Sequence, residues 1–425
     1  MNKFIEYRRE FHKYAENSWH EIRTSARVAE ILEEMGYSCL MGLDAVDYDT
    51  IGFELVDEEG RKADMERAVE QGAKPEYVER TGGFPGVVAV FDTGKEGPVT
   101  GFRFDIDALP YEEPKKPGFR PFDEGYISVN DGSVHACGHD GHTAIGLGIA
   151  EALLAKKDEF KGKIVLAFQP AEESYHGAQS IVNKGHMDEV TNFISLHLAL
   201  SGDNVPLASN TIACGCKDFL SCRQLTVHFH GRSAHPCGAA QEGKNALLAA
   251  CTATLNLHAI PKHESGLTTV NVGQLSGGVA ANTIAPNAEL MVEFRGENRD
   301  ITDYLEKRVF AILDGAAAMH DVTYTFEDYN YAPATKSDDA MMEVIERAAK
   351  KVPWFQKIYF EGNVGGSDDA TAMLIKAQDN GGIGTYIGIG TDTTQPLHNE
   401  EFDFDEDCIP ASIDLCMYAL EELHA

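Results

Sequence analysis

The sequence predicts an α/β fold, in which a larger domain with a mostly parallel sheet flanked by helices is interrupted by a small ferredoxin-like domain. Two short, continuous apolar runs, Lys163–Phe168 and Asn192–Leu198, are typical of buried parallel strands. Further along, the predicted elements follow the order βαββαβ. A chain of 425 residues is also too long for one ordinary core. We expect residues 1–217 and 331–425 to form the larger domain and residues 218–330 the inserted one.

In the larger domain, strands and helices alternate along the chain, as is usual for a parallel sheet. Residues 1–36 have the periodicity of one long amphipathic helix that ends at Gly36. Residues 56–84 are polar and indicate a partly helical surface insertion. The remaining elements expected here are the strand Val87–Phe91, a strand that runs into Asp105 and Asp107, and the helix Gly141–Ala155, followed after the inserted domain by the helices Asp338–Lys350 and Asp369–Lys376 and the strand Thr385–Ile389.

The inserted domain is predicted from a change of pattern near residue 217. Alternating apolar and polar residues indicate strands with one buried face, and two segments have helical spacing. The expected strands are Cys222–His230, Leu267–Leu275, Ala288–Arg295 and Val322–Tyr329, and the expected helices are Asn245–His258 and Asp300–His320.

Composition excludes several classes of protein. With 36 basic against 68 acidic residues the formal charge is −32, which excludes a nucleic-acid partner because phosphate binding needs a basic surface. There is neither a signal-peptide pattern nor an apolar stretch of about 18 residues, so we expect no membrane segment. The nine cysteines are scattered and odd in number, which favours free thiols and the reduced cytoplasm. We interpret Cys214 and Cys216 as buried structural residues.

The strongest chemical signal is the segment VHACGHDGH, residues 134–142, which places three His, one Cys and one Asp close together. Thiolate and imidazole are ligands that suit zinc and other first-row divalent metals. Gly138 and Gly141 allow a tight loop, so that neighbouring side chains can converge on one point. The alternative, a His-rich surface loop, is less consistent with a position between a strand and a helix, where α/β enzymes place their sites.

Other candidate residues follow predicted core strands. Glu172 and Glu173 come directly after the first apolar run, where one carboxylate can bind a metal while the other accepts a proton from water. His197 ends the second run, and His398 follows the last predicted strand. Each of these signals is weak by itself, because paired glutamates are commonly solvated and a lone His is commonly structural.

Taken together, the motifs HACGHDGHTA, QPAEE, GRSAHP, GGVAANTIAPNAEL, GGSDDATAM and LHNEEFDFDE resemble, in this order, those of the metallo-amidohydrolase family that includes carboxypeptidase G. They span nearly the whole chain. With Cys in the motif HACGHD, the chain resembles the amidohydrolase branch of the family rather than the branch that has an Asp in that position. The insertion before Val87 most resembles the aminobenzoyl-glutamate hydrolase group within that branch.

The resemblance implies a dinuclear metal-dependent hydrolase of an amide bond next to a free carboxylate, with Mn²⁺ or Zn²⁺ as its two ions. It implies a role for Glu172 as general base, for Asp107 as the carboxylate that orients a ligating His, and for Cys137 as the bridge between the metals. The remaining metal ligands that it implies are His139, Glu173, His197 and His398. Relatives with an Asp bridge carry a His ligand where this chain has Asp105, so Asp105 is left without a role, as is Asp368.

The resemblance also makes the inserted domain a lid and dimerisation domain. His235 is implied to stabilise the oxyanion, often from across a homodimer interface. Asn282 and Arg295 match positions that contact the carboxylate end of the substrate. An alternative for Arg295 is a salt bridge on the sheet surface.

Two other hypotheses remain open at this point. The first is a cysteine hydrolase with Cys137 as its nucleophile, which leaves Glu172, His197 and His398 unexplained. The second is a chain that needs a related partner subunit for activity. The sequence leaves the acyl group open among an aminobenzoyl-glutamate, another acyl-amino acid and a dipeptide.

Overall fold

The protein was analysed as a computed structural model, which describes residues 2–47 and 56–425. Met1, which belongs to the predicted first helix, and residues 48–55 of the predicted larger domain lie outside the described residues. The chain divides into two compact units, one of Met1–Asp218 with Lys336–Ala425 and the other of Phe219–Thr335. The second boundary falls later than residue 330 because the last strand of the inserted unit, β12, covers Thr323–Ala332.

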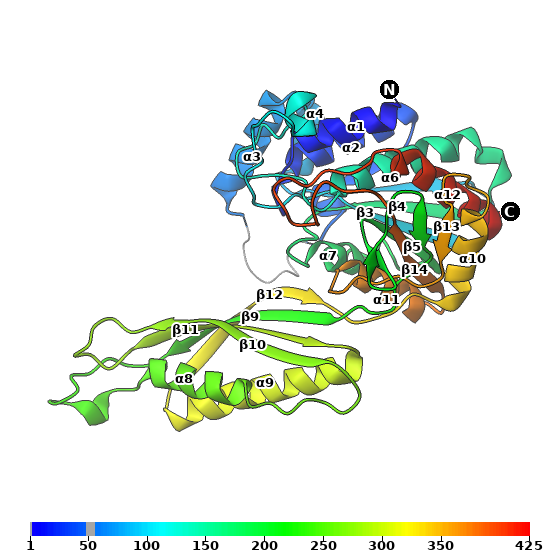
Figure 1. Cartoon of the computed structure of the whole chain (residues 1–425). Coiled ribbons are helices and arrows are strands. Elements are labelled where there is room, and N and C mark those ends of the chain that lie inside the picture. Colours follow the sequence, from blue (N-terminus) through cyan, green and yellow to red (C-terminus); the bar gives the residue numbers. More distant parts are fainter. Residues whose placement is uncertain (1, 48–55) are drawn as a thin grey trace. The chain divides into compact units, whose positions relative to one another are not determined.

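An eight-stranded sheet in the order β1-β2-β4-β3-β5-β14-β8-β13 forms the centre of the larger unit (Figure 1). The four central strands, β4, β3, β5 and β14, are parallel to one another. At one edge β1 and β2 run antiparallel to their neighbours, and at the other edge β8 is antiparallel to β14. The strands cover Cys39–Met41 (β1), Val87–Asp92 (β2), Val99–Asp105 (β3), Lys163–Gln169 (β4), Asn192–Leu198 (β5), Thr211–Ala213 (β8), Lys357–Tyr359 (β13) and Ile383–Ile389 (β14). The short β1, β8 and β13 were not predicted.

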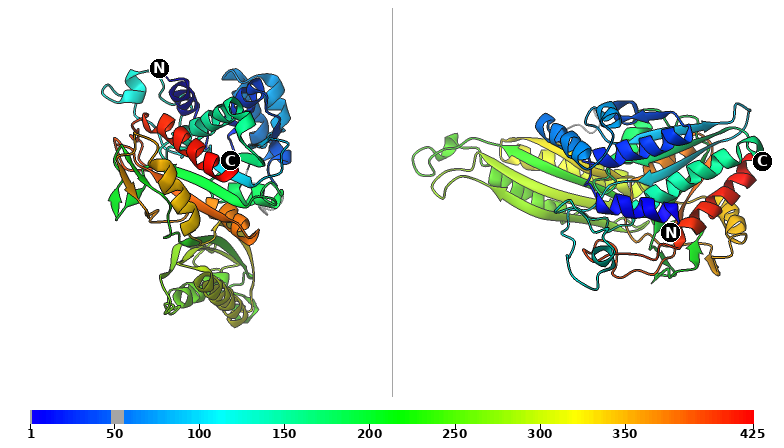
Figure 2. Two further views of the ribbon diagram at one scale, coloured as in Figure 1. Left: turned by 90° about the vertical axis from the view of Figure 1, so that its right-hand side faces the viewer. Right: turned by 90° about the horizontal axis from the view of Figure 1, so that it is seen from above.

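Helices pack on both faces of this sheet, as Figure 1 and the left view of Figure 2 show. On one face, the main core contains residues of α2 (Ile22–Met35), α6 (His139–Ala155), α10 (Asp339–Ala349) and α12 (Cys408–His424). On the other face, α7 (Gly177–Asn183) and α11 (Ala370–Asp379) contribute to a second core. Because both faces are covered, the central strands are mostly apolar on both faces rather than alternating.

The prediction of one helix over residues 1–36 was wrong. Two helices are present, α1 (Lys3–Lys13) and α2, with an irregular linker between them in which Trp19 has a φ of +67°. The apolar residues on either side keep the helical spacing, so the pattern does not reveal the interruption. The predicted insertion contains α3 (Glu58–Glu70) and α4 (Pro75–Thr81). No described helix has both the length and the apolar character needed to cross a membrane.

The smaller unit is an antiparallel four-stranded sheet in the order β10-β11-β9-β12, with α8 and α9 covering one face. Its elements follow the order βαββαβ: β9 (Ser221–His230), α8 (Ala246–Leu257), β10 (Thr268–Gly277), β11 (Asn287–Gly296), α9 (Arg299–Met319) and β12. The order along the chain and the order within the sheet are those of a ferredoxin-like fold.

A buried ionic network ties α1 to two segments that are distant in sequence. The guanidinium of Arg8 lies 2.7 Å from a carboxylate oxygen of Asp140 in the first turn of α6 and 2.9 Å from one of Asp403. His12, also on α1, contacts the same Asp140 oxygen at 2.8 Å. All four side chains are fully buried. Although burial raises it, the charge of Arg8 lowers the pKa of Asp403 to about 2, so this carboxylate is ionised at neutral pH.

Replacing Arg8 by Met should therefore destabilise the larger unit by about 3–5 kcal/mol, because it removes a buried cation from between Asp140 and Asp403, which then rely on His12 and Arg120. Urea denaturation with a chelator present measures this free energy. Arg347→Met is the matched control, since Arg347 pairs with Glu422 on the surface and such exposed pairs contribute about 1 kcal/mol or less. An equal decrease in the free energy of unfolding of the two variants would contradict the proposed stabilising role of the buried Arg8.

Candidate metal centre

The candidate residues of the larger unit come together at one edge of its sheet. The neighbouring strands β4, β3, β5 and β14 are parallel, so their carboxyl ends lie at the same edge, where α/β proteins bind their ligands. Asp105 ends β3, His197 lies at the end of β5, and Glu172 follows β4. His139 begins α6, which packs against this sheet.

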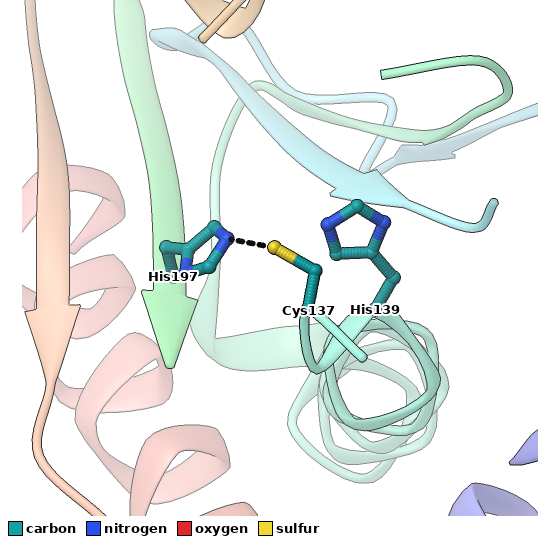
Figure 3. A group of neighbouring side chains, drawn as sticks. All are labelled: Cys137, His139 and His197. Carbon is teal, nitrogen blue, oxygen red and sulfur yellow. Dashed lines mark hydrogen bonds between the residues drawn. The ribbon is translucent and has the colours of Figure 1, made fainter. Parts of the chain in front are cut away.

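Five side chains of metal-ligating type form a cluster there. The Cys137 sulfur lies 3.4 Å from Nε2 of His197 and 3.4 Å from Nε2 of His398. A carboxylate oxygen of Glu173 lies 3.5 Å from Nε2 of His398 and 4.0 Å from Nε2 of His139. Figure 3 shows Cys137 between His197, on the strand, and His139, at the start of the helix. A thiolate between imidazoles and a carboxylate is a donor set that suits a first-row divalent metal.

Hydrogen bonds hold two of these imidazoles so that Nε2 points into the cluster. Nδ1 of His139 donates to the carbonyl oxygen of Asp107 at 2.9 Å, with the Asp107 carboxylate at 3.2 Å. Nδ1 of His197 donates to the carbonyl oxygen of Leu198 at 2.6 Å. Asp107 also accepts from the hydroxyl of Ser18 at 2.7 Å and from the backbone N–H of Glu173 at 3.0 Å. Such partners fix the tautomer of a ligating His and its orientation.

His142, the third His of the motif, has both ring nitrogens engaged away from the cluster. Its Nδ1 donates to Asp105 at 2.5 Å, and its Nε2 accepts the backbone N–H of Leu198 at 3.0 Å. Asp105, which had no role in the sequence-based prediction, thus orients His142 and, through it, the end of β5 next to His197. Because both nitrogens are used, His142 is a structural member of the site and not a candidate ligand.

A second buried network lies next to Glu172. Arg103 of β3 contacts Asp105 at 2.5 Å, Asp368 at 3.1 Å and Asp369 at 3.0 Å, and Asp368 also accepts the hydroxyl of Tyr386. Sequence reasoning missed Arg103 and Tyr386. A charged residue within an otherwise apolar strand was the available signal, because Arg is almost never fully buried unless it is paired.

This network shapes the environment of Glu172, whose carboxylate lies 3.9 Å from Nε2 of His139. Burial raises the pKa of Glu172 well above its usual range, and the carboxylates of Asp368 and Glu173 raise it further. A carboxyl group with a raised pKa beside a metal cluster is suited to accept and later release a proton.

The backbone of the site is strained at several residues that have side chains, among them His398, Ala171 and Tyr175. His398 has a φ of +62° and Ala171, directly before Glu172, a φ of +55°, both in the left-handed region. The N–H of His398 donates to the carbonyl oxygen of Ala136 at 2.8 Å, which places His398 beside the Cys137 loop. At Gly141 an added Cβ would lie 2.7 Å from the ring of Phe404 and 2.8 Å from the side chain of Leu198, so a larger residue would displace one of these side chains.

The cluster has the properties of a cation site. Among the described residues, Nε2 of His139 and one carboxylate oxygen of Glu173 are buried without a hydrogen-bond partner. Burial raises the pKa of Glu173 to about 7, and burial together with Glu173 and Glu172 raises that of Cys137. These shifts reflect a surplus of acidic groups, which a divalent cation would offset. The residues present therefore fit the expected metals.

The remaining predicted residues belong to the smaller unit. His235 is exposed, and its Nδ1 accepts the N–H groups of Cys237 at 3.2 Å and Gly238 at 3.1 Å, which leaves the proton on Nε2. Asn282 lies in the neighbouring loop, which is joined to the His235 loop by a hydrogen bond from Ile284 to Ala234.

Arg295 lies elsewhere in the smaller unit. It lies eight positions along β11 from Asn287, which pairs with His230 at the end of the sheet near the His235 loop. Eight residue steps of an antiparallel strand span about 27 Å. Its guanidinium forms two bonds to Glu293, at 2.8 and 3.1 Å. A single chain therefore holds His235 and Arg295 too far apart to contact one small molecule together.

The arrangement agrees with comparisons to known proteins. Residues 101–422 match the model of peptidase family M20/M25/M40. The chain is 40% identical over 416 residues to the indole-3-acetyl-aspartic acid hydrolase of Enterobacter agglomerans, an alignment that covers 97% of this chain and 94% of the relative. It is 39% identical over 414 residues to one of the subunits of the p-aminobenzoyl-glutamate hydrolase of Escherichia coli, with the same coverage.

A solved structure, the aminobenzoyl-glutamate utilization protein from Klebsiella pneumoniae, superposes with a TM-score of 0.81 at 34% identity and covers 99% of this chain and 95% of that one. The predicted family, the α/β fold and the metal-dependent amidohydrolase class are thus confirmed. The chain belongs to peptidase family M20/M25/M40.

Proposed function

We propose that this enzyme uses two divalent metal ions to hydrolyse the amide bond of an N-acyl or N-aryl amino acid with a free carboxylate, in particular an aminobenzoyl-glutamate. The observation that carries the proposal is the cluster of Cys137, His139, Glu173, His197 and His398, of which Cys137, His139 and His197 are buried, with Glu172 beside it. A solved structure that is 22% identical to this chain is described as a dinuclear metal-binding peptidase. At this identity the two proteins are similar in fold.

In this proposal the cluster would hold the two ions, and Cys137, whose sulfur is close to the imidazoles of His197 and His398, would serve as a shared ligand. When bound, the ions would act as Lewis acids towards the amide carbonyl and lower the pKa of the attacking water. Both Zn²⁺ and Mn²⁺ are compatible with a set of Cys, His and Glu ligands.

The residues of the chain then carry the proton transfers. Glu172 accepts a proton from the attacking water as the new carbon–oxygen bond forms, and delivers it to the nitrogen when the carbon–nitrogen bond breaks. The Nε2–H of His235 donates a hydrogen bond to the developing oxyanion. The products are a carboxylate and an amine, one of which is the released amino acid.

The substrate class rests on the relatives and on the smaller unit. The names of two relatives specify conjugates of aspartate and of glutamate, whose amide nitrogen is adjacent to a free carboxylate. Arg295 would bind that carboxylate in a bidentate manner, in exchange for Glu293, and Asn282 would contribute a further hydrogen bond.

We further propose a homodimer formed through the smaller unit. The strand β10 is at the edge of its sheet, and Leu248 and Leu255 of α8 are exposed. An edge strand and an apolar helix face are surfaces that a second copy can cover. In such a dimer, His235 and Asn282 of one protomer would act on the substrate that is bound by Arg295 and the metals of its partner.

Two alternatives make different predictions. A nucleophilic Cys137 would need an available thiolate, whereas burial raises the pKa of this thiol. A requirement for a related partner subunit is suggested by the name of the relative from Escherichia coli, which describes one subunit of a hydrolase rather than a whole enzyme.

The free state of all nine cysteines supports a location in the reduced cytoplasm.

The proposal is tested on the purified single chain. We expect about two divalent ions per chain and release of glutamate from p-aminobenzoyl-glutamate, lost with a chelator and restored by Mn²⁺ or Zn²⁺. A panel of other N-acyl amino acids and dipeptides serves for comparison. Bound metal with activity only on other substrates would keep the mechanism but replace aminobenzoyl-glutamate as the proposed substrate. Bound metal without activity would support the partner-subunit alternative. Activity that survives metal removal would contradict the mechanism.

Two substitutions separate the base from the metal ligands. Glu172→Gln should keep both ions while kcat falls by about 10²–10⁴-fold, because proton transfer is lost. Cys137→Ala should instead lower the metal content, as measured by elemental analysis. Near-normal turnover of the first variant, or full metal occupancy of the second, would refute the corresponding role.

Mixing experiments test whether His235 acts across the dimer. Neither Glu172→Gln nor His235→Ala should turn over substrate well, but a refolded 1:1 mixture should regain about a quarter of wild-type activity, since half of the dimers then hold one complete site. Leu255→Glu should shift the particle mass towards the monomer, whereas Leu43→Glu, at an exposed leucine of the larger unit, should not. No recovery in the mixture would contradict action in trans.

A further inference from the structure

The linker between α1 and α2 contacts both loops that carry the central chemistry of the site. The hydroxyl of Ser18 donates to Asp107, the carboxylate that orients His139. The carbonyl oxygen of Glu16 accepts the N–H of Ala108, and a carboxylate oxygen of Glu21 accepts the N–H of Ala171 at 2.7 Å. None of these linker residues is a candidate ligand or base, and the predicted long helix left no place for them.

The contact made by Glu21 is the most consequential, because Ala171 is strained. Ala171 is fully buried, has a φ of +55°, and directly precedes Glu172. A residue with a Cβ pays roughly 1–2 kcal/mol to adopt the left-handed conformation. The peptide that joins Ala171 to Glu172 therefore keeps its orientation only while surrounding contacts oppose relaxation.

Hydrogen bonds fix this short segment on both sides of Glu172. After it, the N–H of Tyr175 donates to the carbonyl oxygen of Glu172 at 2.8 Å. Before it, the Glu21 carboxyl group is the acceptor for the N–H of Ala171, and it is fully buried, so water does not compete for this bond. The carbonyl oxygen of Ala171 also accepts the hydroxyl of Ser174 at 3.3 Å and the N–H of Gly177 at 3.4 Å. Loss of the Glu21 contact would therefore free the N–H side of Ala171 while its carbonyl side stays bonded.

We infer that Glu21 is a positioning residue for the reaction: by holding Ala171 in its strained conformation, it sets the direction in which the Glu172 carboxylate meets the attacking water. The inference rests on the proposed role of Glu172 as general base. It assigns Glu21 no contact with substrate or metal, and it predicts an effect on turnover rather than on the binding of either.

The chain offers matched variants for this test. Burial raises the pKa of Glu21, and nearby Asp107 raises it further, so a neutral Gln is a close substitute that keeps the acceptor oxygen. Met keeps a similar length but has no strong acceptor. Glu16 is the control: it is buried in the same linker, but its carboxylate accepts the N–H groups of Arg23 and Thr24 at the start of α2.

The experiment compares Glu21→Met, Glu21→Gln and Glu16→Met in the full chain, with metal content, thermal midpoint, kcat and KM measured for the substrate that the wild type hydrolyses. We expect Glu21→Met to keep its metals while kcat falls by about 10–100-fold, since a displacement near 1 Å can cost 10²-fold, and KM changes by less than about threefold. Glu21→Gln should recover most of kcat. Glu16→Met should lower the thermal midpoint but not the kcat of the folded, metal-loaded protein.

A second substitution tests the strain directly. Glycine adopts positive φ without penalty. In an Ala171→Gly background, the logarithm of the fold-decrease in kcat caused by Glu21→Met should therefore be less than about half of its value in the wild-type background. If Glu21→Met does not fold, Glu21→Asp, which withdraws the carboxyl group by one methylene, replaces it with the same expectations.

Several outcomes would overturn the inference. They are an unchanged kcat in Glu21→Met, a decrease in kcat that is proportional to the decrease in metal content or folded fraction, and an equally large decrease in kcat in Glu21→Gln. An undiminished loss in the Ala171→Gly background would also do so. Failure of the proposed function is a separate result, because it would appear as an inactive wild type or as normal turnover in Glu172→Gln.

Discussion

Buried negative charge at the carboxyl ends of the central strands is the constraint on which the rest of this structure depends. Six carboxyl groups gather there, those of Asp105, Asp107, Glu172, Glu173, Asp368 and Asp369, most of them fully buried. Water does not stabilise charges in such a place, so cations and hydrogen-bond donors of the protein must. Arg103 neutralises the part around Asp368 and Asp369. The part around Glu173 faces Cys137 and three imidazoles, and this is the part that a divalent metal would complete.

The elements around the site contribute the ion pairs and hydrogen bonds that stabilise this buried charge. Arg8, on the first helix, ties Asp140, next to His139, to Asp403, which follows His398 in the chain. The linker after that helix holds Asp107 and the segment before Glu172. The N-terminal region thus joins two ligand-bearing segments that are far apart in sequence. The strained backbone lies close to these supports: Ala171 is bonded to Glu21 of the linker, and His398 is bonded to Ala136 beside the Cys137 loop.

The smaller unit adds a different constraint. Its two groups of predicted substrate-binding residues lie at opposite ends of one sheet, about 27 Å apart by the rise of β11. A rigid antiparallel sheet cannot bring its ends together, so residues at both ends can serve one small substrate only if they come from two chains. This geometry makes the oligomeric state part of the proposed chemistry, in which the exposed face of α8 would be covered by a second copy.

The sequence by itself determined the family, the α/β class, the inserted βαββαβ unit and the identity of the clustered residues, because motifs with reactive side chains and apolar runs are local features. It did not reveal the break between α1 and α2, since the helical spacing of apolar residues continues across the linker. Nor did it assign Arg103, Asp105 or Glu21, whose partners are distant in sequence or are backbone groups. Only the tertiary structure decides which buried polar groups meet, because hydrogen bonds and ion pairs depend on positions in space that periodicity does not encode.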